Sequence, residues 1–79
     1  MNRNYVIVYR VGDEAIFYVA AIMGCADGDM ATEVFFAEHD PKLCRIVGVW
    51  HVDFGLSLRE YGIDGAVIEN TYRAANYIT

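Results

Sequence analysis

Bases, proline and cysteine are all scarce in this sequence. Its 79 residues include six Lys and Arg, one Pro and two Cys. Two cysteines do not make a disulfide-rich scaffold. The longest stretch without a charge, Ala15 to Ala26, has 12 residues, whereas a membrane-spanning helix needs ~20. No signal peptide is recognisable, so we expect a cytoplasmic protein with reduced thiols and no membrane partner.

Bases are missing altogether from one segment, residues 11–41. This segment holds seven of the eleven acids, namely Asp13, Glu14, Asp27, Asp29, Glu33, Glu38 and Asp40. The rest of the chain carries four acids and all six bases, so the net charge of −5 originates in this segment. A pI of about 4.7 argues against direct binding to nucleic-acid phosphates and suits a basic protein partner.

The length predicts one domain over residues 1–79. A chain of this size buries only about 60% of its unfolded surface, so most of its apolar residues must find partners. At 56% hydrophobic residues the supply is ample, so we expect an ordered domain.

Two runs near the N-terminus, residues 5–11 and 15–23, are rich in β-branched and aromatic side chains. Gly12-Asp13-Glu14 separates them, which predicts a β-hairpin with a three-residue loop. A buried helix is the alternative for residues 15–23. Both predicted strands are apolar on both faces, so their sheet needs two covering layers.

The next predicted element is a short helix with Asp29 or Asp27 as its N-cap. It ends at Asp40-Pro41, because the residue before proline is pushed out of the α region. A helical wheel places His39 on the outer face. Residues 32–37 could also form a strand, but we prefer the helix.

Residues 43–52 form a third predicted strand. Gly48 either leaves room for a neighbouring side chain or marks a bulge. Trp50 is expected in the core; exposed together with Phe36, it would instead indicate an interface. Strict alternation predicts a common face for Cys44, Ile46, Gly48, Trp50 and Val52.

The C-terminal third has two further predictions. Residues 54–63 fit either a short fourth strand or, through the capping box Ser57-Leu-Arg-Glu60, one helical turn. Asp64 then caps a helix from about Gly65 to Ile78.

These elements predict an α+β fold with an antiparallel sheet of three or four strands and a C-terminal helix. In its ββαβ core the helix returns across the sheet, so the third strand pairs with the first in the order 2-1-3. Cys25 and Cys44 then fall at opposite ends of the sheet. A disulfide needs Cα atoms within about 7 Å of each other, so we predict free thiols.

The topology gathers the seven carboxylates of residues 11–41 into what we call the acidic ridge. Asp13 and Glu14 in the hairpin turn are expected at the same end of the sheet as Glu38 and Asp40. The other three acids are expected at the opposite end or on the outer helix face. The ridge is either a partner-binding surface or a solvated charged face that only aids solubility.

No metal or catalytic motif accompanies the ridge. Asp27, Asp29 and Glu38 have the spacing of positions 1, 3 and 12 of an EF-hand loop, but Ala31 and Thr32 occupy the positions that need an oxygen ligand and a glycine. No Cys–His nucleophile pair is expected within the third predicted strand, and His39 with either cysteine is the pairing that the sequence leaves open. We therefore predict a non-enzymatic protein with no catalytic residue, metal or cofactor.

The layout of residues 4–53 resembles that of small proteins of phages and mobile elements. It combines a tyrosine-rich hairpin, a short acidic helix ending in His-Asp-Pro, and a β-branched strand with Gly-Val-Trp. Several type I anti-CRISPR proteins share this size, acidity and ββαβ-type layout. The resemblance implies a protein of the host cytoplasm that blocks the DNA-binding groove of a CRISPR surveillance complex. These inhibitors share no functional motif, so no residue role is transferred.

The leading hypothesis is therefore an inhibitor or adaptor, a DNA mimic that binds a basic protein surface through the seven acids of the ridge. The alternative is a homodimeric structural or assembly protein of a phage or mobile element, in which a second subunit covers surplus apolar surface. The first hypothesis is compatible with a monomer and the second requires a homodimer.

Overall fold

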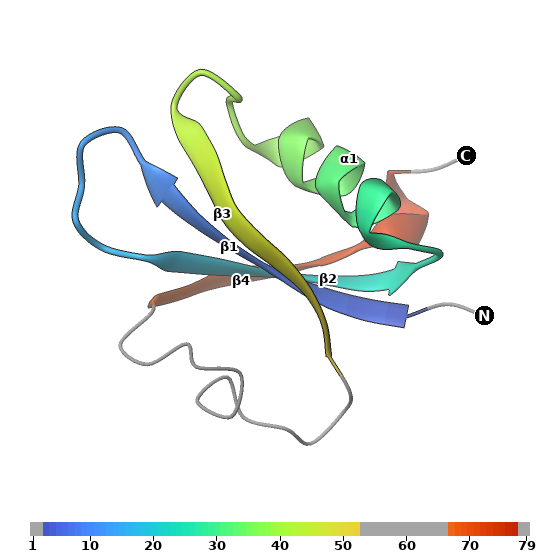
Figure 1. Cartoon of the computed structure of the whole chain (residues 1–79). Coiled ribbons are helices and arrows are strands. Elements are labelled where there is room, and N and C mark those ends of the chain that lie inside the picture. The colour runs from blue at the N-terminus through green and yellow to red at the C-terminus, as the bar shows by residue number, and fades with distance from the viewer. Residues whose placement is uncertain (1–2, 53–66, 78–79) are drawn as a thin grey trace.

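A computed structural model describes residues 3–52 and 67–77. They form strands, one α-helix and a short 3-10 helix (Figure 1). In chain order the elements are β1 (Arg3–Val11), β2 (Tyr18–Cys25), α1 (Gly28–Glu38), β3 (Cys44–Val52), β4 (Val67–Arg73) and η2 (Ala74–Asn76). The predicted α+β class is confirmed. The two predictions for residues 54–63 lie outside the described residues.

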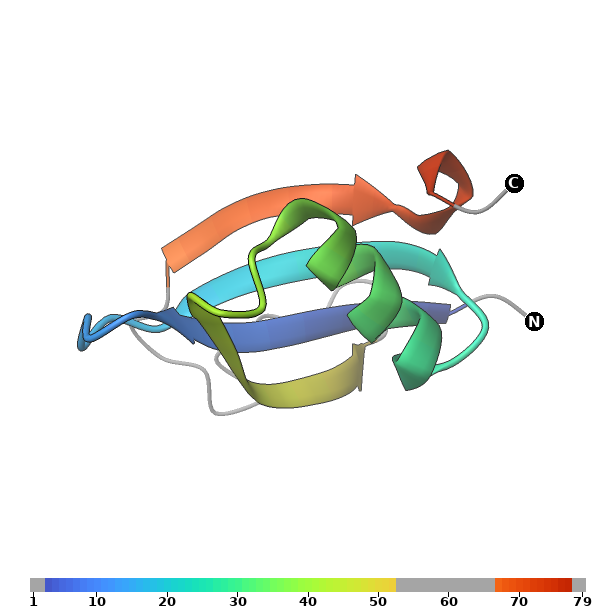
Figure 2. The same ribbon diagram turned by 90° about the horizontal axis from the view of Figure 1, so that it is seen from above.

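The described strands form one sheet in the order β3-β1-β2-β4 (Figure 2). β1 pairs antiparallel with both β2 and β3, which reproduces the predicted neighbours 2-1-3. The prediction of a purely antiparallel sheet is wrong, because β4 pairs parallel with β2 and makes the sheet mixed. The ββαβ order of the first four elements is thus extended by a strand that the sequence did not predict.

The predicted C-terminal helix from Gly65 to Ile78 is wrong. Residues 67–73 form strand β4, and the only helical structure described after it is the 3-10 turn η2. The sequence VIENTYR of β4 contains three β-branched residues and a tyrosine, which favour a pleated strand. β2 also has backbone groups on its second edge that need partners. The hydrogen bonds that residues 67–73 form with this edge favour a strand, although the spacing of their apolar residues fits a helix.

The predicted β-hairpin is confirmed, but its connection, residues 12–17, is longer than the three residues expected. The Gly12 N–H donates to the Leu43 C=O at 2.8 Å, which extends the contact with β3 in place of closing a tight hairpin. Ile16 and Phe17, predicted within the second strand, are instead exposed by 47% and 42%.

Helix α1 lies over β1 and β2 on one face of the sheet (Figure 2). Asp27 is its N-cap, and the Asp27 carboxylate accepts the Met30 N–H at 2.9 Å. Of the two N-caps that the sequence offers, Asp27 is therefore the one used. Ala31, Val34 and Phe35 are buried against the sheet, and the preference for a helix over a strand here is confirmed.

His39 packs against the core and not on the outer face that the helical wheel predicts. Its backbone is extended (φ −129°, ψ 140°), so the helical period does not apply to it. Its ring stacks on Phe35 with centroids 4.0 Å apart and meets the Tyr9 ring edge-on at 5.0 Å. Its Nδ1–H donates to the Phe35 C=O at 2.8 Å. These contacts fasten the end of α1 to the sheet.

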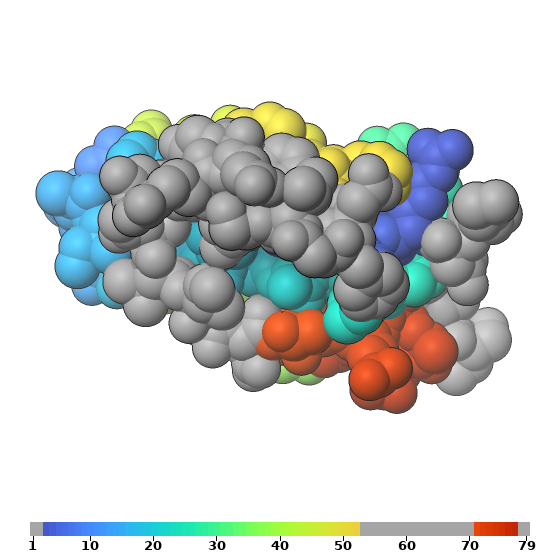
Figure 3. Space-filling model, turned by 90° about the horizontal axis from the view of Figure 1, so that it is seen from below, coloured from blue at the N-terminus to red at the C-terminus, as the bar shows by residue number. Residues whose placement is uncertain are grey.

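Side chains are buried on both faces of the sheet, as the two-sided apolar pattern predicts. Val6, Val8 and Val19 form a small cluster on the face opposite α1. Figure 3 views the molecule from that face, with the β1–β2 connection and the start of β1 at its two ends. On the helix face the buried strand residues are Tyr5, Ile7, Tyr9, Ala20, Ile22 and Cys25.

A β-bulge in β3 changes which of its side chains share a face. Tyr9 pairs with Ile46 and the adjacent Val8 pairs with Gly48, so Val47 is an extra residue on β3. A bulge of this kind interrupts the alternation of side chains. The single face predicted for the residues from Cys44 to Val52 is therefore wrong.

Because of the bulge, even-numbered residues of β3 face α1 before Val47 and odd-numbered residues face α1 after it. Cys44 and Val49 both pack on the helix-side core, whereas Val52 packs on the opposite cluster. Trp50 pairs with Val6 and so shares this opposite face.

Trp50 is 37% exposed and is not the core residue that we expected. A Cβ at Gly48 would collide with the Trp50 ring, so Gly48 leaves the room that this ring occupies. Phe36 packs against the helix-side core. Trp50 and Phe36 therefore lie on opposite sides of the sheet and do not form one surface.

Candidate protein-binding surface

Two carboxylates of the acidic ridge, Asp13 and Glu14, lie in the β1–β2 connection and are exposed. The Glu14 N–H donates to the Val11 C=O at 3.1 Å, and Nε and Nη2 of Arg10 donate to the Glu14 C=O at 3.3 and 3.1 Å. The Glu14 carboxylate accepts the Tyr18 hydroxyl at 2.7 Å. Among the described residues, the Asp13 carboxylate has no hydrogen-bond or ion-pair partner. Within this connection, Asp13 is thus the acid whose charge is fully available.

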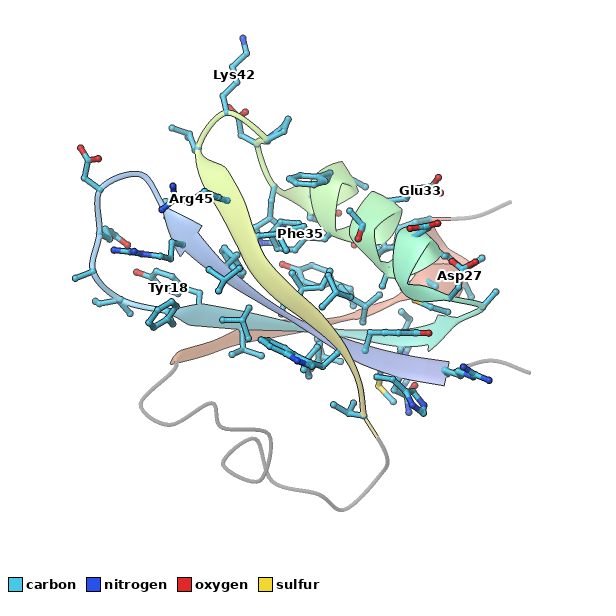
Figure 4. The ribbon with its side chains drawn as sticks, viewed as in Figure 1. Tyr18, Asp27, Glu33, Phe35, Lys42 and Arg45 are labelled. Carbon is cyan, nitrogen blue, oxygen red and sulfur yellow. The ribbon has the colours of Figure 1, made fainter. Side chains whose placement is uncertain are left out.

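Three more carboxylates lie at the start of α1 or on its outer face. Figure 4 shows Asp27 at the start of the helix and Glu33 on its outer side. Asp29 and Glu33 are exposed and four residues apart, which makes them neighbours on a helix surface. Neither has a hydrogen-bond or ion-pair partner within residues 3–52 and 67–77. Because α1 contains no Lys or Arg, its outer face carries only negative charge.

The last two carboxylates lie at the end of α1 and have structural partners. Glu38 accepts the Tyr77 hydroxyl at 2.8 Å, and this hydrogen bond is the main reason that the pKa of Tyr77 is raised. Asp40 accepts the Lys42 N–H at 2.8 Å on its carboxylate and the Cys44 N–H at 2.9 Å on its carbonyl. Asp40 therefore organises the loop between α1 and β3.

The carboxylates of the acidic ridge do not all lie together, because two groups of them lie at opposite ends of the sheet. The β1–β2 connection is hydrogen-bonded to the α1–β3 loop through Gly12 and Leu43, so the acids of these two segments lie at one end of the sheet (Figure 1). Asp27 lies at the other end, where β2 leads into α1. Glu33 lies between the two groups on the helix.

Bases accompany the acids at the hairpin end. Arg10 of β1 and Arg45 of β3 are direct cross-strand partners. Figure 4 shows Lys42 at the tip of the α1–β3 loop and Arg45 on the side of β3 that faces the β1–β2 connection. The charge count over residues 11–41 does not include these bases, because Arg10 lies just before that segment and Lys42 and Arg45 lie after it. The predicted strand order could have found them, since it pairs β1 with β3.

An open groove of about 650 Å³ lies at the same end. Its walls come from Gly12 and Asp13 of the β1–β2 connection, from Phe36 of α1, and from residues 41–46 of the loop and of β3. We call it the hairpin-end groove. The sequence contains no motif that predicts it, because its walls come from three separate segments.

The two thiols are free, as predicted. Cys25 is buried at the end of β2, and this burial, followed by the negative charge of Asp27, raises its thiol pKa. Cys44 is partly buried and lines the hairpin-end groove. The two residues pair with opposite ends of β1, at Arg3 and Val11, which explains why they cannot form a disulfide.

Across residues 3–52 and 67–77, no three His, Cys, Asp or Glu side chains come together in a group that could hold a metal ion. No helix in these same residues has the length and apolar character needed to cross a membrane.

The described chain is an α+β domain in which one helix covers a mixed sheet and presents an acidic outer face. Comparisons with protein-family models, with curated proteins and with solved structures found no significant match. The function proposed below therefore rests on the surface itself and on the resemblance in layout.

Proposed function

We propose that this chain is a non-enzymatic inhibitor or adaptor that binds a basic protein surface through the acidic ridge. The outer face of α1 is the observation that supports this most directly. Asp29 and Glu33 are exposed there and have no partner in the described part of the chain, and the helix itself has no base to neutralise them. The 11 residues of α1 make this face about 16 Å long, enough to meet several cationic side chains.

The resemblance in layout suggests a particular target, the DNA-binding groove of a type I CRISPR surveillance complex in a host cytoplasm. Such a groove holds Lys and Arg side chains that bind phosphates, and carboxylates compete for the same cations. On this proposal the chain excludes target DNA from the complex and contacts no nucleic acid itself.

The test uses charge-neutral variants of nearly unchanged shape. Asp29→Asn with Glu33→Gln removes two charges from α1, whereas Glu60→Gln with Asp64→Asn removes the same number of charges from acids outside residues 11–41 in the sequence and serves as the control for net charge. With a purified surveillance complex, wild type and control should displace a target duplex, and the α1 variant should bind about tenfold more weakly. Added salt should weaken binding further. Equal affinity of the two variants contradicts the role of the ridge.

Affinity capture from host lysate separates the general proposal from the particular target. A protein retained by wild type and control, and lost by the α1 variant and at high salt, supports binding through the ridge even when no surveillance complex is captured. A partner retained equally by all three forms at both salt concentrations shows that the ridge only solubilises the chain.

A homodimeric structural or assembly protein is the second candidate. Val47 and Trp50 are exposed by 51% and 37% on β3, which lies at an edge of the described sheet. An apolar edge strand is a common site of association between chains. Sedimentation at several protein concentrations tests this candidate, and a monomer at every concentration contradicts it.

A further inference from the structure

Strand β3 has a described neighbour on one side only. It pairs with β1 and lies at an edge of the described sheet. In an antiparallel pair, the backbone N–H and C=O groups of successive residues point alternately toward the neighbouring strand and away from it. The outer edge of β3 therefore presents a row of backbone groups with which a further strand can pair.

The hydrogen bond between Gly12 and Leu43 shows which residues form this row. The Gly12 N–H donates to the Leu43 C=O at 2.8 Å, so Leu43 and then Arg45 direct their backbone groups toward β1. The groups of Ile46 point outward by the same alternation. Val49 pairs with β1 two positions from the partner of Ile46, so its groups point outward as well.

The bulge at Val47 gives these outward groups a regular spacing. Ile46 and Val49 are three residues apart in the chain, but their partners Tyr9 and Ile7 are only two residues apart on β1. They therefore have the spacing of alternate residues in a regular strand. Both side chains also pack on the helix side of the sheet. A second β3, laid antiparallel, can place its Val49 opposite Ile46 and its Ile46 opposite Val49, with matching faces and matching hydrogen-bond directions.

The two-fold axis of this arrangement also brings the exposed side chains of β3 together. Val47, 51% exposed, lies at the axis and meets the Val47 of the second copy. Arg45 and Trp50 share the face opposite α1 and lie two β1 positions to either side of the axis. Arg45 of one copy therefore lies opposite Trp50 of the other. A guanidinium is attracted to the face of a tryptophan ring, and this ring is 37% exposed.

The distribution of charge favours contact at this strand. The chain has a net charge of −5, so two copies repel each other over most approaches. β3 contains no Asp or Glu and carries the positive charge of Arg45. The pairing sets this cation against the negative face of the Trp50 ring, so the two edges are complementary in charge as well as in hydrogen bonding.

We propose that the outer edge of β3 binds the same edge of a second copy of this chain, antiparallel and about a two-fold axis at Val47. The sheets of the two copies then form one continuous sheet. A two-fold contact uses the same surface on both copies, so the assembly closes as a dimer. This inference rests on the homodimer that is the second candidate of the proposed function, and it adds the strand, the register and the axis.

Trp50 is the only tryptophan of the chain and reports on this contact. Sedimentation of the full chain at several concentrations should fit a monomer–dimer equilibrium, and Trp50 fluorescence should shift to shorter wavelength over the same range as the ring leaves water. Val47→Asp should weaken dimerisation about tenfold or more, because two carboxylates meet at the axis. Ile16→Asp makes the same change at a 47% exposed site in the β1–β2 connection and should leave both measurements unchanged.

An engineered disulfide tests the register. In a chain that carries Cys25→Ala and Cys44→Ala, Val47→Cys should form a disulfide-linked dimer under mild oxidation, because the two thiols meet at the axis. Leu43→Cys is the control, at a site that is 57% exposed. It should stay monomeric, because antiparallel pairing places the two Leu43 positions about 25 Å apart. Gel electrophoresis without a reducing agent measures both products.

The outcomes separate this inference from the candidate on which it rests. A monomer at every concentration contradicts the homodimer and this inference together. A dimer that Val47→Asp leaves intact, or that Leu43→Cys links as readily as Val47→Cys, overturns the β3 interface alone. A peptide of residues 43–52 should compete with dimerisation, whereas a peptide of the same residues in scrambled order should not. Equal competition would mean that the edge accepts any extended segment, and would overturn the second copy as its specific occupant.

Discussion

The outer face of α1 and the hairpin end of the sheet carry the same kinds of acidic side chain in different surroundings. On α1, Asp29 and Glu33 have no base on their own helix and no partner among the described residues. At the hairpin end, Glu14 and Asp40 accept hydrogen bonds that hold turns together, and Glu38, at the end of α1, accepts one from the Tyr77 hydroxyl.

This difference shows that the number of acids in a segment does not predict the charge of the surface it forms. Arg10, Lys42 and Arg45 reach the hairpin end from outside residues 11–41, through the pairing of β1 with β3 and through the α1–β3 loop. The acids that build turns there also have their charges partly engaged. The helix face, with fewer acids, is the more uniformly negative of the two surfaces.

Both surfaces depend on one core residue, and its removal should have the largest effect. Phe35 is fully buried and contacts the rings of Tyr9, Phe36 and His39. Phe35→Ala should lower the free energy of unfolding by about 3–5 kcal/mol, and chemical denaturation measures it. Phe17→Ala, at a 42% exposed site, is the control and should cost less than about 1 kcal/mol. Equal losses would mean that Phe35 does not hold the two surfaces together.

Asp27 and Asp40 provide a matched test of the two ends. Asp27→Ala removes the N-cap of α1 and Asp40→Ala removes the acceptor for the Lys42 N–H. Each should cost about 1 kcal/mol, whereas the Asn variants, which keep an acceptor oxygen, should cost little. Hydrogen exchange should accelerate at Met30 in the first case and at Lys42 in the second. Acceleration at both ends in either variant would show that the ends are coupled.

The reactivity of the two cysteine thiols allows the two ends of the sheet to be compared. Cys25 is buried with a raised thiol pKa, whereas Cys44 borders the groove. At pH 8, iodoacetamide should therefore modify Cys44 first, because the thiolate is the reactive form. Mass spectrometry of peptides from the timed reaction identifies the modified residue. Faster modification of Cys25 would contradict its burial.

The raised pKa of Cys25 also makes stability depend on pH. The folded protein holds this proton more tightly than the unfolded chain, whose thiol has the ordinary pKa of 9.0. The stabilisation is complete below that value and is lost as the pH rises through the folded pKa. Denaturation at pH 7 and pH 10 should show a smaller alkaline loss in Cys25→Ala than in wild type. An equal loss would assign the effect to other groups.

The smallest effects are expected from the tyrosines that hold Glu14 and Glu38. Tyr77 donates to Glu38, so its pKa lies above the ordinary value of 10.0. In an ultraviolet titration, Glu38→Gln should lower the pKa of Tyr77 toward that value, while Glu14→Gln should leave Tyr77 unchanged. Tyr77→Phe identifies the transition. No difference between the two glutamine variants would contradict the hydrogen bond.

Several elements could be predicted from the sequence because they depend on neighbouring residues. The hairpin follows from two apolar runs around Gly12, and the start of α1 from the cap Asp27. The free thiols follow from the order of the strands. Strand β4 could not be predicted in this way. Its partner is β2, more than 40 residues earlier in the chain. The spacing of apolar residues within one segment carries no information about such a distant partner.

The candidate surfaces divide in the same way. The base-free helix face could be predicted, because all of its acids come from one continuous segment. The hairpin-end groove could not, because Gly12, Phe36 and Arg45 meet there only after three elements have packed. The bulge at Val47 could not be predicted either, because it depends on the register between β1 and β3.

The sequence by itself determined the acidic segment, the hairpin, the helix and the order 2-1-3 of the first three strands. These depend on side-chain period, caps and turn residues, which act over a few positions. Only the tertiary structure decided that the sheet is mixed, that Arg10 and Arg45 lie side by side, and that the hairpin end carries both charges around a groove. The physical reason is that backbone hydrogen bonds and charges act between residues that are close in space, whatever their distance along the chain.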